Sequence, residues 1–460
     1  MTTPIYYIND VPHIGHAYAT FAADILARYH RAVGDDTFFL TGTDENSQKT
    51  VLAAEKAKKD IKEYTEELSE KWRSTWKKLE ITNDDFIRTT GTRHKEKVLE
   101  IFEKIKRSGD IYKGKYKGLY CVGHEAFLKE ADLDQNGLCP EHQTKPEYIE
   151  EENYFFRLSK YQDPLIKFFE KNPDFVEPQE RYNEVFNFIK GGLQDISVTR
   201  ETQKWGITAP NDPKHVIYVW FDALINYISA NPKKWPADLH LIGKDILRFH
   251  AVIWPAMLLS ASLPPPKKIF AHGFFTIDGV KISKSLGNAI DPLAISEKYG
   301  VDALRYYLFK EIPFGNDGDF SFKRFEEVYN ANLANGLGNL VARVARLCET
   351  VGLEIEDKGA EYEFPKNYKE ALEDLRFQDA LSIIWHKITN VDRKIDKEKP
   401  WELVKKDTRK AAAVLTTYVK EIREIQTLLV PFLPGASEKI SNQFAGPKVK
   451  SAELLFPRMK

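Results

Sequence analysis

The stretch between residues 2 and 29 constrains the fold of this chain more than any other. Residues 2–8 are mostly β-branched or aromatic, which predicts a strand, and the Asn-Asp pair that follows is typical of a turn. Tyr18, Phe21, Ile25, Leu26 and Tyr29 then recur at helical spacing. The chain therefore turns from strand to helix at residues 13–16, which read His-Ile-Gly-His.

A strand-to-helix corner of this kind favours an anion. Backbone N–H groups and the positive end of the helix dipole point outwards there. His13 and His16 add hydrogen-bond donors, and Gly15 has no side chain to keep a flat ring away. These features predict a site for a nucleotide phosphate chain. The alternative is an N-terminal helix cap that contains two histidines by chance.

A second stretch, residues 278–288, favours the nucleotide site over that alternative. It reads DGVKISKSLGN and is rich in Gly and Ser. Lys281 and Lys284 lie three positions apart, so that they can close over a triphosphate and neutralise the charge that grows on a leaving pyrophosphate. Lysines on loops are usually only solvated. It is the combination of the two stretches that indicates a function.

Composition narrows the class of protein. The net charge is −1 with 29% charged residues, so nucleic acid would have to be bound by local basic surfaces. Three cysteines cannot form a disulfide framework, which indicates a reducing compartment. The longest apolar run, near residues 251–261, is short and broken by Pro255, and there is no leader pattern. We therefore expect a cytoplasmic protein outside the membrane, with roughly two to four structural units.

Predicted strands and helices alternate after the first corner. A strand is expected at 37–40, followed by Thr-Gly-Thr and then Asp44. A carboxylate at the carboxyl end of a parallel strand lies where such sheets bind ligands, so Asp44 could hold an ammonium group. Helices are expected over residues 48–57, 61–79 and 92–107. The alternation predicts an α/β fold with a doubly wound parallel sheet.

The pattern is interrupted between residues 112 and 212 by short aromatic strands and glycines. Two residues separate Cys121 from His124, and two separate Cys139 from His142. Four such ligands fit a tetrahedral structural zinc, which would stabilise a region with little core of its own. The alternative is a hairpin without metal, because such patterns specify a metal only loosely.

The sheet pattern resumes after this insertion. Strands are expected at 216–227 and 268–276, with a second strand-to-helix corner at 241–245. The remainder is helical, with apolar three-and-four spacing over 301–310, 325–351, 368–396, 409–429 and 436–444. We therefore predict a split doubly wound, Rossmann-like fold with a small inserted domain and a C-terminal helical bundle. The predicted segments are 1–111 and 213–288 for the two halves of the nucleotide fold, 112–212 for the insertion, 289–324 for a connector and 325–460 for the bundle.

Residues 13–16 and 281–285 resemble the HIGH and KMSKS signatures of class I aminoacyl-tRNA synthetases, with Ile282 in place of the usual Met. Residues 2–7, 42–45, 153–156, 219–224 and 242–245 extend the similarity to bacterial methionyl-tRNA synthetases over essentially the whole chain. The resemblance implies ATP-dependent joining of methionine to its tRNA through methionyl-adenylate. The chain departs from the family at residues 45–48, which read Glu-Asn-Ser-Gln where many relatives have Glu-His-Gly-Gln.

The resemblance also implies roles for individual residues. Catalysis would involve His13, His16, Lys281, Lys284 and Arg200, and ATP would be held by His13, Gly15, His16, Gly243, Asp245, Phe275 and Lys284. Methionine would be held by Ile5, Tyr7, Asp44, Ile196, Trp220, Ala223, Leu224, Tyr227, Phe249 and His250. This set is chemically reasonable, because aromatic edges suit a polarisable thioether and one acid suits the amino group. Mg²⁺ is expected on the pyrophosphate.

In the bundle, Asn339, Arg343 and Trp401 match the anticodon-binding positions of the family. One helical turn separates Asn339 from Arg343, and an indole can stack on a splayed base. The alternative for Trp401 is a packing role at a helix start after Pro400. The implied partners are methionine, ATP and the initiator and elongator methionine tRNAs, and the implied connector contacts the tRNA stem. We expect a monomer.

Two other functions compete with this interpretation. Isoleucyl-, valyl-, leucyl- and cysteinyl-tRNA synthetases share the two signatures. The branched-chain enzymes usually carry a larger editing insertion, however, because a binding site discriminates one methylene by only about 1–3 kcal/mol. A catalytically silent paralogue that binds tRNA is the other alternative, and the intact His13, His16, Lys281 and Lys284 argue against it.

Overall fold

The structure, a computed structural model, describes residues 1–121, 126–128, 130, 133–140, 143–281, 289–355 and 363–459. The chain divides into two compact units. The first contains residues 1–12 and 38–272, and the second contains residues 13–37 and 273–460. The first strand and the first helix therefore belong to different units.

A parallel sheet of six strands organises the first unit. Its order is β3 (Asp85–Arg88), β2 (Leu40–Asp44), β1 (Thr2–Tyr7), β11 (His240–Gly243), β12 (Ile269–His272) and β7 (Val176–Glu177). All neighbouring strands run parallel, which confirms the predicted doubly wound sheet. The strand order reverses between β1 and β11, and sheets of this type bind ligands beside such a reversal, at the carboxyl ends of the strands.

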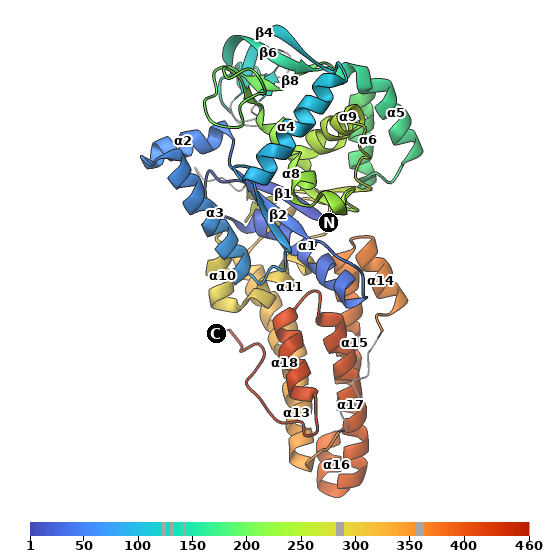
Figure 1. Cartoon of the computed structure of the whole chain (residues 1–460). Helices are drawn as coiled ribbons and strands as arrows, with labels where there is room; N and C mark the ends of the chain where they lie inside the picture. Colours follow the sequence, from blue (N-terminus) through green and yellow to red (C-terminus); the bar gives the residue numbers. More distant parts are fainter. Residues whose placement is uncertain are drawn as a thin grey trace. The chain divides into compact units, whose positions relative to one another are not determined.

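The helices of the first unit are amphipathic. In α4 (Thr92–Arg107), Val98, Ile101, Phe102 and Ile105 are buried at three-and-four spacing, and charged residues occupy the other face. Figure 1 shows α2 and α3 as a neighbouring pair. The other helices are α2 (Gln48–Ala57), α3 (Ile61–Lys78), α5 (Gln162–Lys171), α6 (Gln179–Lys190), α7 (Val219–Ala223), α8 (Asn226–Ala230) and α9 (Trp254–Ser260).

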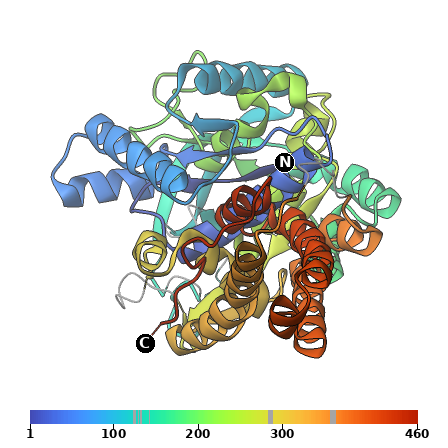
Figure 2. The same ribbon diagram turned by 90° about the horizontal axis from the view of Figure 1, so that it is seen from below.

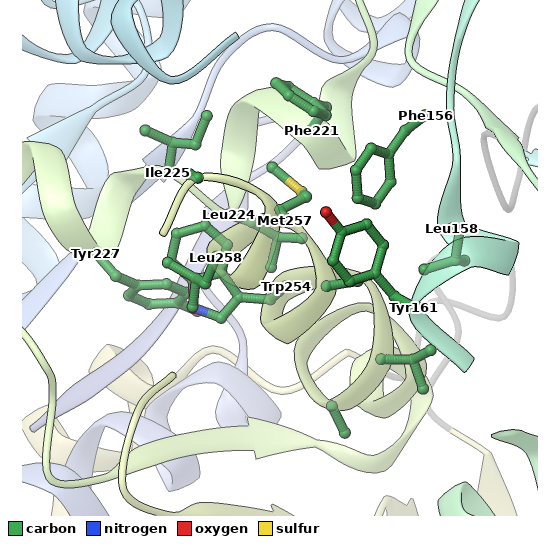
Figure 3. Close-up of a cluster of buried hydrophobic side chains, with 14 of the residues drawn as sticks. Phe156, Leu158, Tyr161, Phe221, Leu224, Ile225, Tyr227, Trp254, Met257 and Leu258 are labelled. Carbon is green, nitrogen blue, oxygen red and sulfur yellow. The ribbon is translucent and has the colours of Figure 1, made fainter. Parts of the chain in front are cut away.

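The hydrophobic core of this unit joins the insertion to the nucleotide fold. Figure 3 shows Phe156 and Tyr161, which precede α5, gathered with Phe221 of α7 and Trp254 and Met257 of α9. Burial of each large apolar side chain contributes about 1.5–3 kcal/mol. The insertion also supplies the edge strand β7 of the parallel sheet, so part of it is integral to the fold.

A second sheet, of four antiparallel strands, is built mainly from the insertion. Its order is β5 (Ala126–Leu128), β4 (Ile111–Cys121), β6 (Glu147–Phe156) and β8 (Ile196–Ser197). Short strands were expected here, but β4 and β6 pair over ten residue positions, from Ile111 opposite Phe156 to Tyr120 opposite Glu147. A separate pair, β9 (Thr199–Arg200) and β10 (Val216–Ile217), follows.

The second unit is mainly helical. A small sheet of β14 (Val280–Lys281), β13 (Phe275–Ile277) and β15 (Gly318–Phe320) precedes the bundle helices, which Figure 2 shows in orange and red, packed side by side. Its helices are α1 (Ile14–Ala32), α10 (Pro292–Tyr299), α11 (Val301–Glu311), α12 (Phe322–Val328), α13 (Asn339–Val351), α14 (Lys366–Glu373), α15 (Phe377–Glu398), α16 (Pro400–Lys406), α17 (Thr408–Leu429) and α18 (Pro434–Phe444). No helix in the described part of the chain is long and apolar enough to span a membrane.

Four further sequence predictions of local structure were wrong in type or extent. The strand expected at 216–227 ends at Ile217 and continues as α7 and α8, because a short apolar run does not distinguish a strand from a buried helix. The strand expected at 268–276 is two strands in different sheets. The chain breaks at Gly273, where a Cβ atom would lie 2.3 Å from the Asn316 carbonyl carbon.

The other two concern boundaries. The helix expected over 368–396 is interrupted between α14 and α15, where Leu375 adopts a left-handed φ of 55°. The strand expected at 37–40 begins at Leu40 and ends at Asp44. Asp44 is therefore the last residue of a parallel strand, and this places its side chain at the ligand-binding edge.

Candidate active site

Two strand ends in the first unit bring Tyr7 and Asp44 together. They are register partners at the carboxyl ends of β1 and β2, and the backbone N–H of Ile8 donates to the carbonyl oxygen of Asp44 over 3.4 Å. The Asp44 side chain is buried, and one of its oxygens accepts the backbone N–H of Asn46 at 3.2 Å. A buried carboxylate thus stands at the sheet edge where a cationic group can approach.

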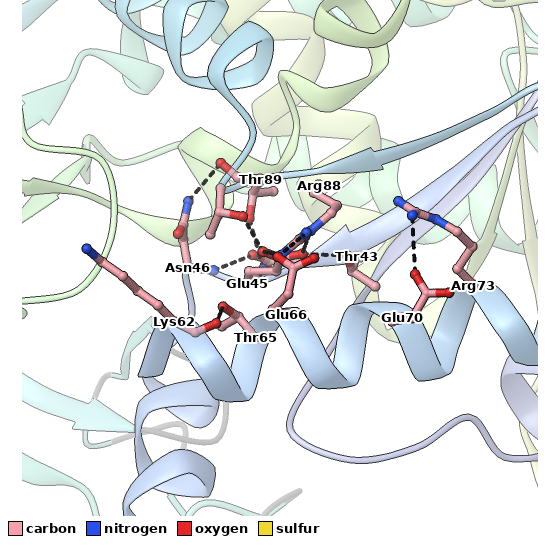
Figure 4. Close-up of polar contacts among 12 residues, drawn as sticks. Thr43, Glu45, Asn46, Lys62, Thr65, Glu66, Glu70, Arg73, Arg88 and Thr89 are labelled. Atoms are coloured by element: carbon pink, nitrogen blue, oxygen red, sulfur yellow. Dashed lines mark hydrogen bonds and ion pairs between the residues drawn. The ribbon is translucent and has the colours of Figure 1, made fainter. Parts of the chain in front are cut away.

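The loop after Asp44 is fixed by a buried glutamate. Glu45 accepts two hydrogen bonds from Arg88, at 2.7 and 3.2 Å, and another from Thr43 (Figure 4). The Thr90 hydroxyl also donates to Glu45. Burial opposes the charge of Arg88, but the hydrogen bonds and negative charges of Glu45 and Glu66 together outweigh that effect and raise the pKa of Arg88. The indole N–H of Trp205 donates to the Glu45 carbonyl at 2.8 Å. The loop that begins at Asp44 is therefore held on both its backbone and its side chains.

Aromatic rings from distant parts of the sequence lie close to Tyr7. Trp220 of α7 is stacked on Phe249, with ring centroids 3.8 Å apart and planes inclined by 7°. The Tyr7 and Trp220 rings form a T-shaped pair with centroids 6.4 Å apart. The Trp220 and His250 rings form another, with centroids 6.1 Å apart. These rings offer the flat, polarisable surface that a thioether favours. Ala223 and Leu224 follow Trp220 and are buried, and Ile5 and Ile196 are partly buried against the same core.

Tyr227 and His250 form a buried neutral pair. The imidazole Nδ1 donates to the Ile246 carbonyl at 2.9 Å, so Nε2 accepts from the Tyr227 hydroxyl at 2.7 Å. Burial lowers the pKa of His250 to about 4, against a smaller opposing effect of the Ile246 bond. Burial also raises the pKa of Tyr227. This part of the site therefore carries no charge at neutral pH.

The end of β11 has little room for side chains. A Cβ atom on Gly243 would lie 2.5 Å from a carboxylate oxygen of Asp245, whose side chain crosses that position. Asp245 itself is exposed, in the short turn after β11. An exposed carboxylate beside a bare backbone at a strand end suits the hydroxyl groups of a sugar.

In the second unit, His13 and His16 together cap α1. The backbone N–H of Gly15 donates to Nδ1 of His13 at 3.1 Å, and the backbone N–H of His13 donates to Nδ1 of His16 at 3.2 Å. The two rings are stacked with centroids 3.7 Å apart. Because both Nδ1 atoms accept, each neutral imidazole carries its proton on Nε2. The helix-cap interpretation and the anion-site interpretation are thus compatible.

The structure describes the remaining candidates for catalysis and ATP binding to different extents. Phe275 is buried in β13 with its ring 4.5 Å from that of Tyr18, and the backbone of Lys281 ends β14. Lys284 lies outside the described residues. Arg200 is buried, donates to the Ser197 hydroxyl at 2.9 Å and the Thr199 carbonyl at 2.8 Å, and lies 4.3 Å from the Tyr218 ring. Its visible contacts fix the β9–β10 segment.

The predicted zinc ligands are only half described, because His124 and His142 lie outside the described residues. Cys121 and Cys139 are both buried, and both approach Thr144. The sulfur of Cys121 lies 4.0 Å from the Thr144 hydroxyl, and the backbone N–H of Cys139 donates to the Thr144 carbonyl at 2.9 Å. Among the described residues no cluster of three metal-ligating side chains is present.

The predicted anticodon residues lie on two helices of the bundle. Asn339 is exposed at the start of α13, and Trp401, 38% exposed, lies in the first turn of α16. Arg343 pairs with Asp392 at 2.8 Å and with Asp396 at 3.1 Å. Burial raises the pKa of Asp392 despite the opposing charge of Arg343. The exposed indole is consistent with a stacking role, while Arg343 already has carboxylate partners.

The polar residues that support the site do not stand out in the sequence. Glu45, Arg88, His94 and Asp222 are conspicuous only in the structure, which shows Glu45, His94 and Asp222 buried. Their sequence signal is weak. A charged residue within an apolar run, such as Asp222, indicates a buried polar partner but does not identify it.

Known proteins resemble this chain over nearly its whole length. The family model described as tRNA synthetases class I (M) matches residues 1–148 and 135–345. The methionine–tRNA ligase of Thermotoga maritima is 47% identical, over 99% of this chain and 76% of that protein. The corresponding ligase of a Nostoc species is 46% identical, over 96% of this chain and 89% of that protein.

Solved structures show the same similarity. The methionyl-tRNA synthetase of Mycobacterium tuberculosis in complex with methionyl-adenylate superposes with a TM-score of 0.91 at 37% identity, with 99% of each chain covered. The apo form of that protein gives a TM-score of 0.82 at 34% identity, over 100% of this chain and 97% of the other.

Proposed function

Since this chain belongs to the family of methionyl-tRNA synthetases, we propose that its substrates bind at the strand ends and the helix cap described above. The enzyme attaches methionine to tRNA in an ATP-dependent reaction through methionyl-adenylate. The relatives named for methionine are 43–47% identical, and they favour methionine over the branched-chain amino acids and cysteine. Intact His13 and His16 argue against a silent paralogue.

One observation carries the methionine site: a buried Asp44 next to Tyr7, with Trp220 and Phe249 stacked nearby. Asp44 would accept the ammonium group of methionine, and the rings would contact the thioether. The neutral Tyr227–His250 pair suits the thioether of methionine, which is uncharged. Ile5, Ile196, Ala223 and Leu224 would complete the apolar surface.

For ATP, we assign the sugar hydroxyls to Gly243 and Asp245 and the adenine edge to the backbone of Phe275. The protons on Nε2 of His13 and His16, together with the start of α1 at Gly15, would donate to phosphate oxygens. The methionine carboxylate attacks the α-phosphorus, an oxygen–phosphorus bond forms, and the bond to pyrophosphate breaks. Lys281 and Lys284 would neutralise the leaving pyrophosphate. Mg²⁺ bound to the phosphates would add positive charge there.

Arg200 contributes differently in this proposal. The Arg200 side chain is buried, and its contacts with Ser197, Thr199 and Tyr218 hold the segment between the insertion and α7 in place. We therefore assign Arg200 to positioning that segment, with direct neutralisation of phosphate as the second possibility to be tested by pyrophosphate exchange of an Arg200→Lys variant.

We also propose a structural zinc held by Cys121, His124, Cys139 and His142. The contacts of both cysteines with Thr144 support it, because they bring two soft ligands near the same residue. Metal analysis of the purified protein should find about one equivalent of zinc, and Cys139→Ala should remove it. Absence of zinc from fully active protein would favour the metal-free hairpin.

For tRNA, we propose that Asn339, Arg343 and Trp401 read the anticodon. Their placement on bundle helices and the exposure of Trp401 support this. Such a site would accept initiator and elongator methionine tRNAs alike, because both carry the methionine anticodon. We propose a cytoplasmic monomer, which sedimentation at micromolar concentration can test.

Exchange of labelled pyrophosphate into ATP tests the proposed function, with methionine, isoleucine, valine, leucine and cysteine compared in parallel. Stimulation by methionine alone is expected. Stimulation by another of these amino acids, or by none, would contradict the assignment.

A further inference from the structure

Four polar side chains form a continuous buried chain in the first unit. The Ser229 hydroxyl lies 2.8 Å from Nδ1 of His94, and Nε2 of His94 lies 2.6 Å from one oxygen of Asp222. The other oxygen of Asp222 accepts the side-chain N–H of Asn46 at 2.7 Å. Asn46, His94 and Asp222 are at most 2% exposed, and Ser229 is 5% exposed.

The order Ser–His–Asp invites comparison with a hydrolytic triad, but burial excludes that role. A nucleophile must reach a substrate, whereas the Ser229 hydroxyl is enclosed and also contacts the Asn226 carbonyl at 3.1 Å. Asp222 accepts from both neighbours, so each of its oxygens has a defined donor. Fully satisfied buried networks of this kind fix the elements that they join.

The elements joined carry two of the proposed methionine ligands, Asp44 and Trp220. Asp222 lies on α7 between Trp220 and Ala223. Asn46 lies two residues after Asp44, and its backbone N–H donates to the Asp44 carboxylate. The same side-chain nitrogen of Asn46 also donates to the Thr89 carbonyl at 3.3 Å, so the loop is tied to the residue after β3 as well (Figure 4).

We propose that Asn46 and Asp222 are positioning residues for methionine, which set the Asp44 carboxylate against the helix that carries Trp220. The inference rests on the proposed function. It adds that selection of the substrate depends on a buried amide–carboxylate bond that never touches the substrate. His94 and Ser229 hold the far side of Asp222 and prevent its carboxylate from turning away.

Exchanging the two side chains tests this proposal. Asn46→Asp places two carboxylates face to face and removes the donor. Adding Asp222→Asn restores one donor and one acceptor, with the amide now at position 222 and the carboxylate at position 46. The oxygen of the introduced amide can still accept from His94. We expect the KM for methionine in pyrophosphate exchange to rise about thirtyfold in the single variant and to recover about tenfold in the exchanged pair, with kcat and the KM for ATP nearly unchanged.

A matched control removes another buried hydrogen bond to a carboxylate, elsewhere in the first unit. Ser260→Ala deletes a 2.7 Å hydrogen bond to the buried Asp110 carboxylate and should leave the KM for methionine unchanged even where it lowers stability. The proposal is overturned if Asn46→Asp keeps the wild-type KM for methionine, or if the exchanged pair is no better than Asn46→Asp. A wild-type protein without methionine-dependent exchange would instead refute the proposed function itself.

Discussion

The guanidinium of Arg305 lies 2.8 Å from the carboxylate of Asp24, and neither side chain is exposed. Asp24 belongs to α1, the helix that His13 caps, and Arg305 belongs to α11. Arg305 also donates to the carbonyls of Pro431 and Phe432, just before α18, at 2.9 and 2.8 Å. Within the second unit, the buried Arg305 side chain thus joins α1, the helix of the proposed phosphate site, to the segment just before α18.

Removal of this cation should destabilise the second unit strongly. Arg305→Met takes a donor from two carbonyls and a positive charge from the buried Asp24 carboxylate, which Arg28 still contacts, so we expect a loss of about 3–5 kcal/mol in urea unfolding followed by circular dichroism. Arg28→Met is the control, because Arg28 is partly exposed and should matter less. Equal effects of the two substitutions would contradict a special role for Arg305.

Replacement of His13 can separate its two roles. Asparagine is a preferred N-cap residue and can accept the Gly15 N–H as Nδ1 of His13 does, but it lacks a donor at the Nε2 position. His13→Asn should therefore keep the wild-type melting temperature and slow pyrophosphate exchange by about a hundredfold. His13→Ala should lose both the activity and about 1 kcal/mol of stability. An active His13→Asn enzyme would show that the imidazole serves only as a cap.

Acid should destabilise the first unit before most carboxylates titrate. The folded-state pKa of His250 is about 4, below the ordinary value of 6.5, because burial disfavours its charged form, and burial lowers the pKa of His240 in the same direction. This contribution to stability is complete above pH 6.5 and is lost as the pH falls towards 4.

Between pH 7 and pH 5, His250 alone should account for a loss of about 2 kcal/mol in the free energy of unfolding. His250→Gln should show a correspondingly flatter pH dependence in urea titrations. Wild-type stability that is constant over this range would mean that His250 is accessible to protons in the folded state.

The exposed indole of Trp401 should affect tRNA charging but not adenylate formation. Loss of a base stack is worth roughly 1–3 kcal/mol, so Trp401→Ala should slow charging of methionine tRNA by about ten- to hundredfold while pyrophosphate exchange stays nearly intact. Both assays belong on the same preparation. Equal loss in the two would identify Trp401 as a packing residue, and undiminished charging would place the anticodon contact elsewhere.

Local patterns in the sequence were enough to predict the strand-to-helix corner at His13 and the parallel sheet. Both rest on strong signals: β-branched runs, a turn pair and helical spacing over α1. The helix α7 was mistaken for a strand because residues 216–227 are apolar almost throughout, and only tertiary packing decides such a segment. The break at Gly273 depends on contact with Asn316, which lies more than forty residues away in sequence.

The sequence singles out individual candidate site residues but not the polar network behind them. Asp44 and Trp220 follow from motif and strand position, and the structure places Tyr7 beside both. The hydrogen bond between Asn46 and Asp222 joins residues 176 positions apart, and both residue types are common on surfaces, so no local sequence pattern predicts it. Long-range polar pairing of this kind requires the fold to be known first.

Asp44 is the proposed ligand of the methionine amino group and the central residue of the proposed methionine site. Asp44→Asn keeps the size of the side chain and removes its charge, so the most direct measurement is the KM for methionine of this variant in pyrophosphate exchange. A charged hydrogen bond contributes roughly 1.5–3 kcal/mol, and we predict a rise of about ten- to hundredfold with an unchanged KM for ATP. A KM for methionine equal to that of the wild type would contradict the proposed site.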